Sequence, residues 1–459
     1  MRRWGWAGTL TLSAALVAGA ASATDLSESV ARAQHYDPTL QASNYANKAG
    51  QEGRNQATAL YLPQISLTGE YERVWSQTNV TVPPNFPFQI LAPLTSAGNV
   101  YGYGVTLTQP LYSADVSVKA TQLRDQAKLA EVDNQRAQQD LIARVSEAYF
   151  NVIVGADTLR YVRAEKAAVA QQLASAKARF QAGRANITDV QDAEARYDGI
   201  IAQEISAENN LAEWQARYER SVGQDPENLV QLPEHFQPTL PDPDDMNEWI
   251  RRAVAGNLDV QSKLIQQNIA NKAIDLYTLS SRPQLGLFAS YSDMRQSGDL
   301  SFIIAPDRKQ AAAIGLQLSF PIFTGGALES QLREARATSE QVNYEVQAAR
   351  ADVTVQVREI FQDIAAGVKG IQALEQAAVT AKTSLEANEL ALKVGVKTTQ
   401  DVLNAEQTYY QTLEELEQAR YQYLMAVISL QLLTGQLNGA AVMQVNNQLH
   451  GMAPEPAHK

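Results

Sequence analysis

The chain lacks cysteine and has few histidines, and these absences exclude several kinds of chemistry. Its 459 residues include no Cys and only four His. No disulfide, thiolate ligand or acylated cysteine is therefore available, and the histidines share no metal-ligand spacing. No Gly-x-x-x-x-Gly-Lys-Ser/Thr segment is present to hold the phosphates of ATP. We expect no catalytic residue, cofactor or metal site, because nothing gathers into the convergent cluster that a helical periplasmic enzyme would need.

Long apolar runs are also missing, except at the start. Residues 1–23 carry Arg2 and Arg3, then an apolar stretch, then Ala21-Ser22-Ala23. This order of basic, apolar and small residues is typical of a secretory signal peptide, which predicts cleavage after Ala23. No later segment has the roughly 18 successive apolar residues of a membrane-spanning helix. The mature chain is therefore expected to leave the cytoplasm without a helical anchor.

Acidic residues outnumber basic residues in the chain as a whole. The formal net charge is −12 at pH 7, and loss of the signal peptide, which has two arginines and no acid, makes the mature chain more acidic still. Such a balance argues against nucleic acid or an anionic membrane surface as the principal partner.

One helix-turn-helix pattern is present twice, 212 residues apart. The first copy contains Gly183-Arg184-Ala185-Asn186-Ile187-Thr188-Asp189-Val190, and the second contains Gly395-Val396-Lys397-Thr398-Thr399-Gln400-Asp401-Val402. A chain built from two copies of one unit favours an architectural role over a catalytic one. The copies define repeats at 24–223 and 244–436, with a proline-rich linker at 224–243 and an expected irregular tail at 437–459.

Four short segments alternate with a period of two, as strands with one apolar face do. They lie at 65–72, 101–108, 285–292 and 314–320, and they predict two hairpins, at 64–109 and 284–320, with loops at 77–99 and 293–310. An ordinary half-buried sheet and an outer-membrane β-barrel both fit this alternation. Four strands cannot close a barrel in lipid, so a membrane barrel would have to be shared by several chains.

The remainder predicts helix. Two stretches, 113–180 and 327–394, contain no proline and few glycines, and at 1.5 Å per residue each would be about 100 Å long. Other helices are expected at 25–60, 188–222, 244–281 and 400–434. The apolar positions of the long stretches are mostly alanine rather than leucine heptads, which favours a sheet of helices closed into a tube over a simple dimeric coiled coil.

Other classes of protein remain open on these grounds. A soluble periplasmic adaptor or coiled-coil scaffold would also contain long helical hairpins, but it would not need two hairpins with one apolar face. An autonomous porin would need many more strands. Fractionation separates these classes, because a duct is an outer-membrane oligomer and an adaptor is a periplasmic protein.

Several motifs at matching ends of both repeats resemble one family. They are Ile187-Thr188-Asp189-Val190, Thr399-Gln400-Asp401-Val402, Arg282-Pro283-Gln284-Leu285 before a strand, and Phe320-Pro321-Ile322-Phe323-Thr324-Gly325-Gly326 after one. The chain resembles the TolC family of outer-membrane efflux and type I secretion channels. The resemblance implies a mixed fold, with a long α-helical coiled-coil tunnel in the periplasm and four β-strands per protomer. In a homotrimer these strands would form a shared 12-stranded barrel in outer-membrane lipid.

The resemblance also implies a function, partners and a gate. The duct would passively conduct small molecules or unfolded protein, together with a periplasmic adaptor protein and an inner-membrane RND, MFS or ABC transporter. The sequence does not show whether small molecules or unfolded protein are transported. Asp189 and Asp401 would form carboxylate rings at the periplasmic constriction, and Lys397 would link to the Thr188-Asp189 turn. Asn404 and Leu392 stand where some members have aspartate and tyrosine, which leaves the charge and strength of the closed gate open.

Overall fold

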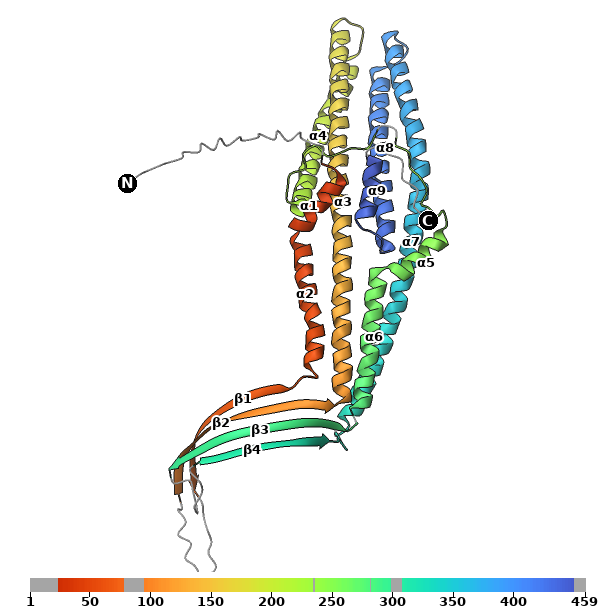
Figure 1. Cartoon of the computed structure of the whole chain (residues 1–459). Helices are drawn as coiled ribbons and strands as arrows, with labels where there is room; N and C mark the ends of the chain where they lie inside the picture. Colours follow the sequence, from red (N-terminus) through yellow and green to blue (C-terminus); the bar gives the residue numbers. More distant parts are fainter. Residues whose placement is uncertain (1–23, 78–94, 234–235, 281, 299–307, 450–459) are drawn as a thin grey trace, which may run out of the picture. The chain divides into compact units, whose positions relative to one another are not determined.

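The computed structural model describes residues 24–77, 95–233, 236–280, 282–298 and 308–449 (Figure 1). These residues divide into two compact units. One, here the tip unit, comprises the described parts of 1–38, 138–249 and 356–459. The other, here the sheet unit, comprises those of 39–137 and 250–355. The predicted signal peptide, with its cleavage site at Ala23, lies outside the described residues.

A four-stranded antiparallel sheet occupies one end of the sheet unit. Its strands are β1 (Gln64–Gln77), β2 (Thr95–Tyr112), β3 (Gln284–Gly298) and β4 (Arg308–Ser319), in that spatial order. All four predicted strands are confirmed. The strands extend further into the expected loops than predicted, because the period of two continues there with polar side chains that give no hydrophobic signal.

The strand register separates the side chains into two chemically different faces. Leu107 lies opposite Ala289, and Leu316 lies opposite Leu287, so these leucines share one face. We call it the apolar face. It also carries Ile65, Leu67, Val105, Tyr291, Ile314 and Leu318. The opposite, polar face carries Ser66, Thr68, Gly104, Thr106, Ser290, Ser292, Ala313 and Gln317. Leu316 and Leu318 are 64% and 70% exposed, so the described residues leave much of the apolar face uncovered.

Close helix packing in the sheet unit depends on small residues. Helix α2 (Pro38–Ala59) lies against the first part of α3 (Ala114–Gln181). A Cβ atom on Gly50 would lie 2.3 Å from the Cβ of Ala130, and one on Gly53 would lie 2.8 Å from the carbonyl oxygen of Leu123. Larger residues at these glycines would push the helices apart, which explains why this surface contains alanine and glycine rather than leucine.

Two helices predicted as continuous are each broken once. The stretch 25–60 forms α1 (Leu26–Tyr36) and α2, because Pro38 disfavours helical geometry at the residue before it. The stretch 244–281 forms α5 (Met246–Gly256) and α6 (Leu258–Leu279). Here the Asn257 side chain accepts hydrogen bonds from the backbone of the first turn of α6, a cap that favours a new helix start.

The long helices bury residues at seven-residue intervals. In the tip unit, α3 and α7 (Ala327–Lys393) pack with α4 (Ile187–Val222) and α8 (Thr399–Leu433). Buried residues at this spacing include Val145, Val152 and Leu159, then Val162, Val169 and Ala176 in α3, and Val357, Ile364, Ile371 and Ala378 in α7. A seven-residue period is the pattern of a coiled coil. It was hidden in the sequence because valine, isoleucine and alanine occupy the seam.

The segment expected to be an irregular tail, 437–459, contains a helix. Its α9 (Gly439–Leu449) buries Ala441, Val442, Val445, Asn446 and Leu449, the spacing of one helical face. The Asn438 side chain accepts hydrogen bonds from the backbone of the first turn. The expectation was wrong because Gly439 and the later prolines outweighed this spacing; residues 450–459 lie outside the described residues.

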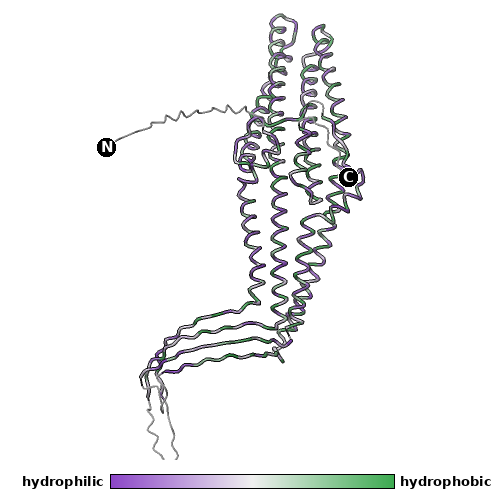
Figure 2. The backbone as a smooth tube through the Cα atoms, in the orientation of Figure 1, coloured by the Kyte–Doolittle hydropathy of each residue, from purple (hydrophilic) through white to green (hydrophobic). Residues whose placement is uncertain are grey.

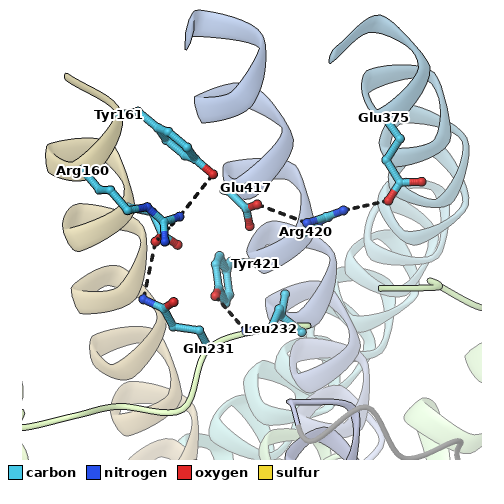
Figure 3. Close-up of polar contacts among 9 residues, drawn as sticks. Arg160, Tyr161, Gln231, Leu232, Glu375, Glu417, Arg420 and Tyr421 are labelled. Atoms are coloured by element: carbon cyan, nitrogen blue, oxygen red, sulfur yellow. Dashed lines mark hydrogen bonds and ion pairs between the residues drawn. The ribbon is translucent and has the colours of Figure 1, made fainter. Parts of the chain in front are cut away.

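Buried tyrosines fasten the proline-rich linker to the helices of the tip unit. The Tyr149 hydroxyl donates to the carbonyl of Val230 at 2.9 Å. The Tyr421 hydroxyl accepts from the backbone N–H of Leu232 at 3.3 Å (Figure 3), and the Tyr423 hydroxyl accepts from the N–H of Thr239 at 3.0 Å. The segment predicted as a linker by composition is therefore held by α3 and α8 at Val230, Leu232 and Thr239.

No described helix is sufficiently long and apolar to cross a membrane. Figure 2 shows the apolar residues of the helices spread along their length and interrupted by hydrophilic ones.

Candidate functional site at the hairpin tips

Both helical hairpins turn at a glycine and restart with the same cap. Gly183 and Gly395 have φ values of 71° and 80°, a left-handed conformation that glycine adopts without strain. Helix α4 starts at Ile187 and α8 starts at Thr399, each one residue earlier than predicted. Asp189 and Asp401 each occupy the third helical position. Their carboxylates accept the backbone N–H groups of Asn186 at 3.2 Å and Thr398 at 2.9 Å, so both aspartates help to cap their helices.

Lys397 pairs with its own turn. Its Nζ lies 3.2 Å from Oδ1 of Asp401, and both side chains are partly exposed. The backbone N–H of Thr398, then its hydroxyl, then Lys397 hold the pKa of Asp401 below its usual range. Thr188 is exposed, and Asn404 accepts a hydrogen bond from Gln400. The predicted link from Lys397 to the Thr188-Asp189 turn is not formed within the chain and stays a prediction for neighbouring chains.

Two contacts that the sequence did not indicate join α3 to α8 near the tips. Arg179 Nη2 donates to the Thr399 hydroxyl at 3.3 Å. Further from the turn, Gln172 Nε2 donates to Oε1 of Glu406 at 3.3 Å. The sequence signal for the first contact was a difference between the repeats: Arg179 corresponds to Ala391, and Thr399 corresponds to Ile187. These two contacts tie the hairpins of one chain together.

Each helical hairpin has an ion pair at the same position of the repeat, but the acidic and the basic residue have changed places. Arg163 on α3 lies 2.7 Å from Glu208 on α4. The residues 212 positions later are Glu375 on α7 and Arg420 on α8, whose charged atoms lie 2.8 Å apart (Figure 3). The same cross-helix position therefore holds an ion pair in both repeats, which shows that the repeats share side-chain packing as well as helix order.

Another ion pair of the first repeat has no counterpart in the second repeat. Lys177 lies 3.3 Å from Glu194 at the exposed surface of the first repeat. The corresponding residues are Glu389 and Glu406. Glu406 is 1% exposed, and its Oε2 has no hydrogen-bond partner among the described residues. Burial raises the pKa of Glu406 to about 7; the Gln172 hydrogen bond opposes this, whereas nearby Glu389 and Glu165 add to it.

Glu406→Gln should make thermal stability less dependent on pH. A carboxyl whose pKa is raised by folding binds its proton more tightly in the folded state. Ionised Glu406 therefore destabilises the folded state. This effect is absent below the ordinary pKa of a glutamate, grows as pH rises from about 4.5, and is complete above about 7. The variant should raise the unfolding midpoint at about pH 8 by a few degrees and change it little at about pH 5. Helical circular dichroism measures this, with Glu194→Gln as the exposed control at the equivalent position; identical pH profiles for the two variants would contradict the assignment.

A polar cavity of about 350 Å³ lies between α3, α4 and α8, away from the turns. It is lined in part by Glu165, Arg196, Asn210, Gln411 and Glu414. Glu165 is neutralised by an ion pair with Arg196, and burial raises the pKa of Glu414 to about 7. No three metal-ligating side chains converge within the described ranges. The hollow is thus a polar seam between helices.

Comparison with known proteins decides the family. The family described as outer membrane efflux protein matches residues 30–224 and 249–436. The outer membrane protein TolC of Vibrio cholerae is 32% identical over 439 residues, covering 95% of this chain and 97% of the relative. The chain belongs to the outer membrane efflux protein family. TolC of Escherichia coli is 31% identical, covering 93% of this chain and 85% of the relative. The alkaline protease secretion protein AprF of Pseudomonas aeruginosa is 28% identical, covering 88% of this chain and 83% of the relative.

Solved structures share the fold at low sequence identity. The outer membrane protein VceC of Vibrio cholerae superimposes with a TM-score of 0.73 at 17% identity, covering 89% of this chain and 96% of the other. The CmeC outer membrane channel of Campylobacter jejuni gives 0.74 at 15% identity, covering 93% and 90%. The resemblance inferred from the hairpin motifs is therefore confirmed. The protein is an outer-membrane exit channel, with its helical part in the periplasm, and not an enzyme.

Proposed function

We propose that three copies of this chain form one channel. The observation that carries the proposal is the sheet, whose apolar face is uncovered and whose outer strands, β1 and β4, each pair on one side only among the described residues. Unpaired strand edges are not tolerated in lipid. Three four-stranded sheets joined edge to edge give twelve strands, with the apolar faces toward lipid and the polar faces lining a water-filled path.

The helices continue this path through the periplasm to the hairpin tips. A passive duct needs an energy source elsewhere, so the proposed partners are a periplasmic adaptor and an inner-membrane transporter of the RND, MFS or ABC class. Among the relatives, AprF is named for secretion of alkaline protease and BepC for outer-membrane efflux. These names support either unfolded protein or small molecules as the transported class.

The tips form the proposed periplasmic gate. Three copies of Asp189 and of Asp401 would place two rings of carboxylates around the axis, with Thr188 and Asn404 as their neutral neighbours. In the closed state, Lys397 is proposed to leave Asp401 of its own chain and to contact the Thr188-Asp189 turn of an adjacent chain. An exposed pair of this kind contributes about 0 to 1 kcal/mol, so the closed gate depends on threefold repetition.

Recovery of the cognate adaptor tests the proposed function. Crosslinking in intact cells, followed by capture of the tagged chain from detergent-solubilised outer membrane, should recover a periplasmic adaptor and its inner-membrane transporter. The transporter's class would then identify drug efflux or type I secretion. If the chain is instead recovered as a monomer from periplasmic extract, it is a soluble adaptor or scaffold and the duct is excluded.

A further inference from the structure

Two arginines lie directly opposite each other on the apolar face of the sheet. Arg295 of β3 pairs with Arg308 of β4, and Tyr101 and Tyr71 complete the same row across β2 and β1. Both arginine side chains are 49% exposed. Like charges directly opposite on neighbouring strands destabilise a sheet, so this row needs negative charge from somewhere.

The sheet supplies one carboxylate for the two cations. Asp293 is 2% exposed, and its Oδ1 lies 3.0 Å from Nε of Arg308 and 3.8 Å from Nε of Arg295. Gln310 Nε2 also donates to this carboxylate at 3.1 Å. Arg308 is the closely held partner and Arg295 is the looser one. Among the residues that the structure describes, one positive charge in this cluster is left without a carboxylate of its own, and both arginine side chains remain about half exposed.

The depth of this row in the sheet matches a membrane interface. The helices join the strands at Gln64, Tyr112, Gln284 and Ser319, so the opposite strand ends point away from the periplasm. Arg295 follows Leu285, the first apolar residue of β3, by ten positions. At about 3.4 Å per residue and a strand tilt of 35–45°, this corresponds to a height of about 25 Å, the thickness of the apolar band of such barrels.

Aromatic residues mark the same level. Tyr71, Tyr101, Tyr103 and Tyr291 occupy this row or the two rows beneath it on the apolar face, where aromatic girdles meet the headgroups. Val105 and Leu67 lie in the row of Tyr291. The next row beneath is aliphatic, with Leu107 opposite Ile65. The two guanidinium groups therefore lie beside the headgroups of the leaflet that faces the outside.

We propose that Arg295 and Arg308 bind the phosphate group of an outer-leaflet glycolipid. The inference rests on the proposed function, because it requires the apolar face to meet lipid. Guanidinium groups bind phosphate through paired, charge-assisted hydrogen bonds. Asp293 orients Arg308, Arg295 supplies the unneutralised charge, and the tyrosines contact the sugar and the upper acyl chains. A structural role alone, in which Arg308 neutralises Asp293, would leave Arg295 without a task.

Native mass spectrometry of the full-length protein in mild detergent tests the site. The probes are bis-phosphorylated lipid A and the same lipid after removal of both phosphates. Arg295→Gln should weaken retention of the phosphorylated lipid about tenfold. Because removal of Arg308 alone would strand Asp293, it is replaced as the double variant Arg308→Gln with Asp293→Asn, which should weaken retention similarly. The matched control is Lys309→Gln, which removes a positive charge from the adjacent position on the polar face and should leave retention unchanged.

Each outcome separates the proposal from its alternatives. Equal retention of the dephosphorylated lipid, or equal effects of Arg295→Gln and Lys309→Gln, would overturn it. Complete competition by millimolar inorganic phosphate would show a free-anion site and would also overturn the assignment to a lipid. The oligomeric mass is measured in the same spectra. Intact trimers that retain both lipids equally refute only this site, whereas the absence of trimers refutes the proposed channel.

Discussion

Leu316→Arg should abolish most membrane assembly, whereas Gln317→Arg should leave it near the parent level. The two residues are neighbours on β4 but lie on opposite faces of the sheet, with Leu316 opposite Leu287 and Gln317 opposite Gly286. An arginine on the lipid side costs about 2 to 4 kcal/mol at the bilayer midplane and less toward the interfaces. A trimer would carry this cost three times, while an arginine on the polar face would reach water and meet no side chain on Gly286.

Trimer yield in isolated outer membranes, measured by gel mobility before and after heating, distinguishes the two variants. Thr106→Arg and Leu107→Arg form a second matched pair on β2, where Leu107 shares the apolar face and Thr106 does not. If both members of each pair reduce assembly equally, the apolar face does not meet lipid.

Replacing the tip carboxylates should remove most of the channel's cation preference. Asp189→Asn combined with Asp401→Asn eliminates the two charges per chain, which are six in a trimer. An asparagine oxygen can still accept the backbone hydrogen bonds that Asp189 and Asp401 receive from Asn186 and Thr398. The helix starts should therefore survive while the electrostatic field at the mouth is lost.

Reversal potentials in planar bilayers under a salt gradient measure this effect, together with block by trivalent cations from the periplasmic side. The double variant should lose the cation preference, because the Lys397 charge then remains without Asp401, and it should resist block. Asp198→Asn, which removes one carboxylate per chain nine residues along α4 from Asp189, is the control and should behave like the parent. Unchanged selectivity in the double variant would mean that these carboxylates only cap helices and that the constriction lies elsewhere.

The elements and the faces of the sheet were predictable because they depend on local periodicity. Alternation within each strand separates Leu107 from Thr106 and Leu316 from Gln317, and the strand register puts the two leucines on one face. The caps at Asp189 and Asp401 were equally local, since a capping residue interacts with backbone three positions away. The break before Pro38 and the cap at Asn438 were also written in the sequence, but stronger neighbouring signals obscured them.

What could not be predicted depends on which helices meet. Glu194 and Glu406 occupy the same position of the repeat, yet one is exposed beside Lys177 and the other is buried near Glu389. Nothing local to either residue distinguishes them, because burial is decided by α3 packing against α8. The Arg179 contact with Thr399 has the same origin.

The mass of the particle extracted from outer membranes in mild detergent tests the central claim most directly. A sheet with two unpaired edges and one uncovered apolar face cannot be stable in lipid as a single copy. Native mass measurement should therefore give three chains per particle, with no folded monomer in the membrane fraction. A monomeric membrane-inserted barrel, or a soluble monomer confined to the periplasmic fraction, would contradict the shared channel.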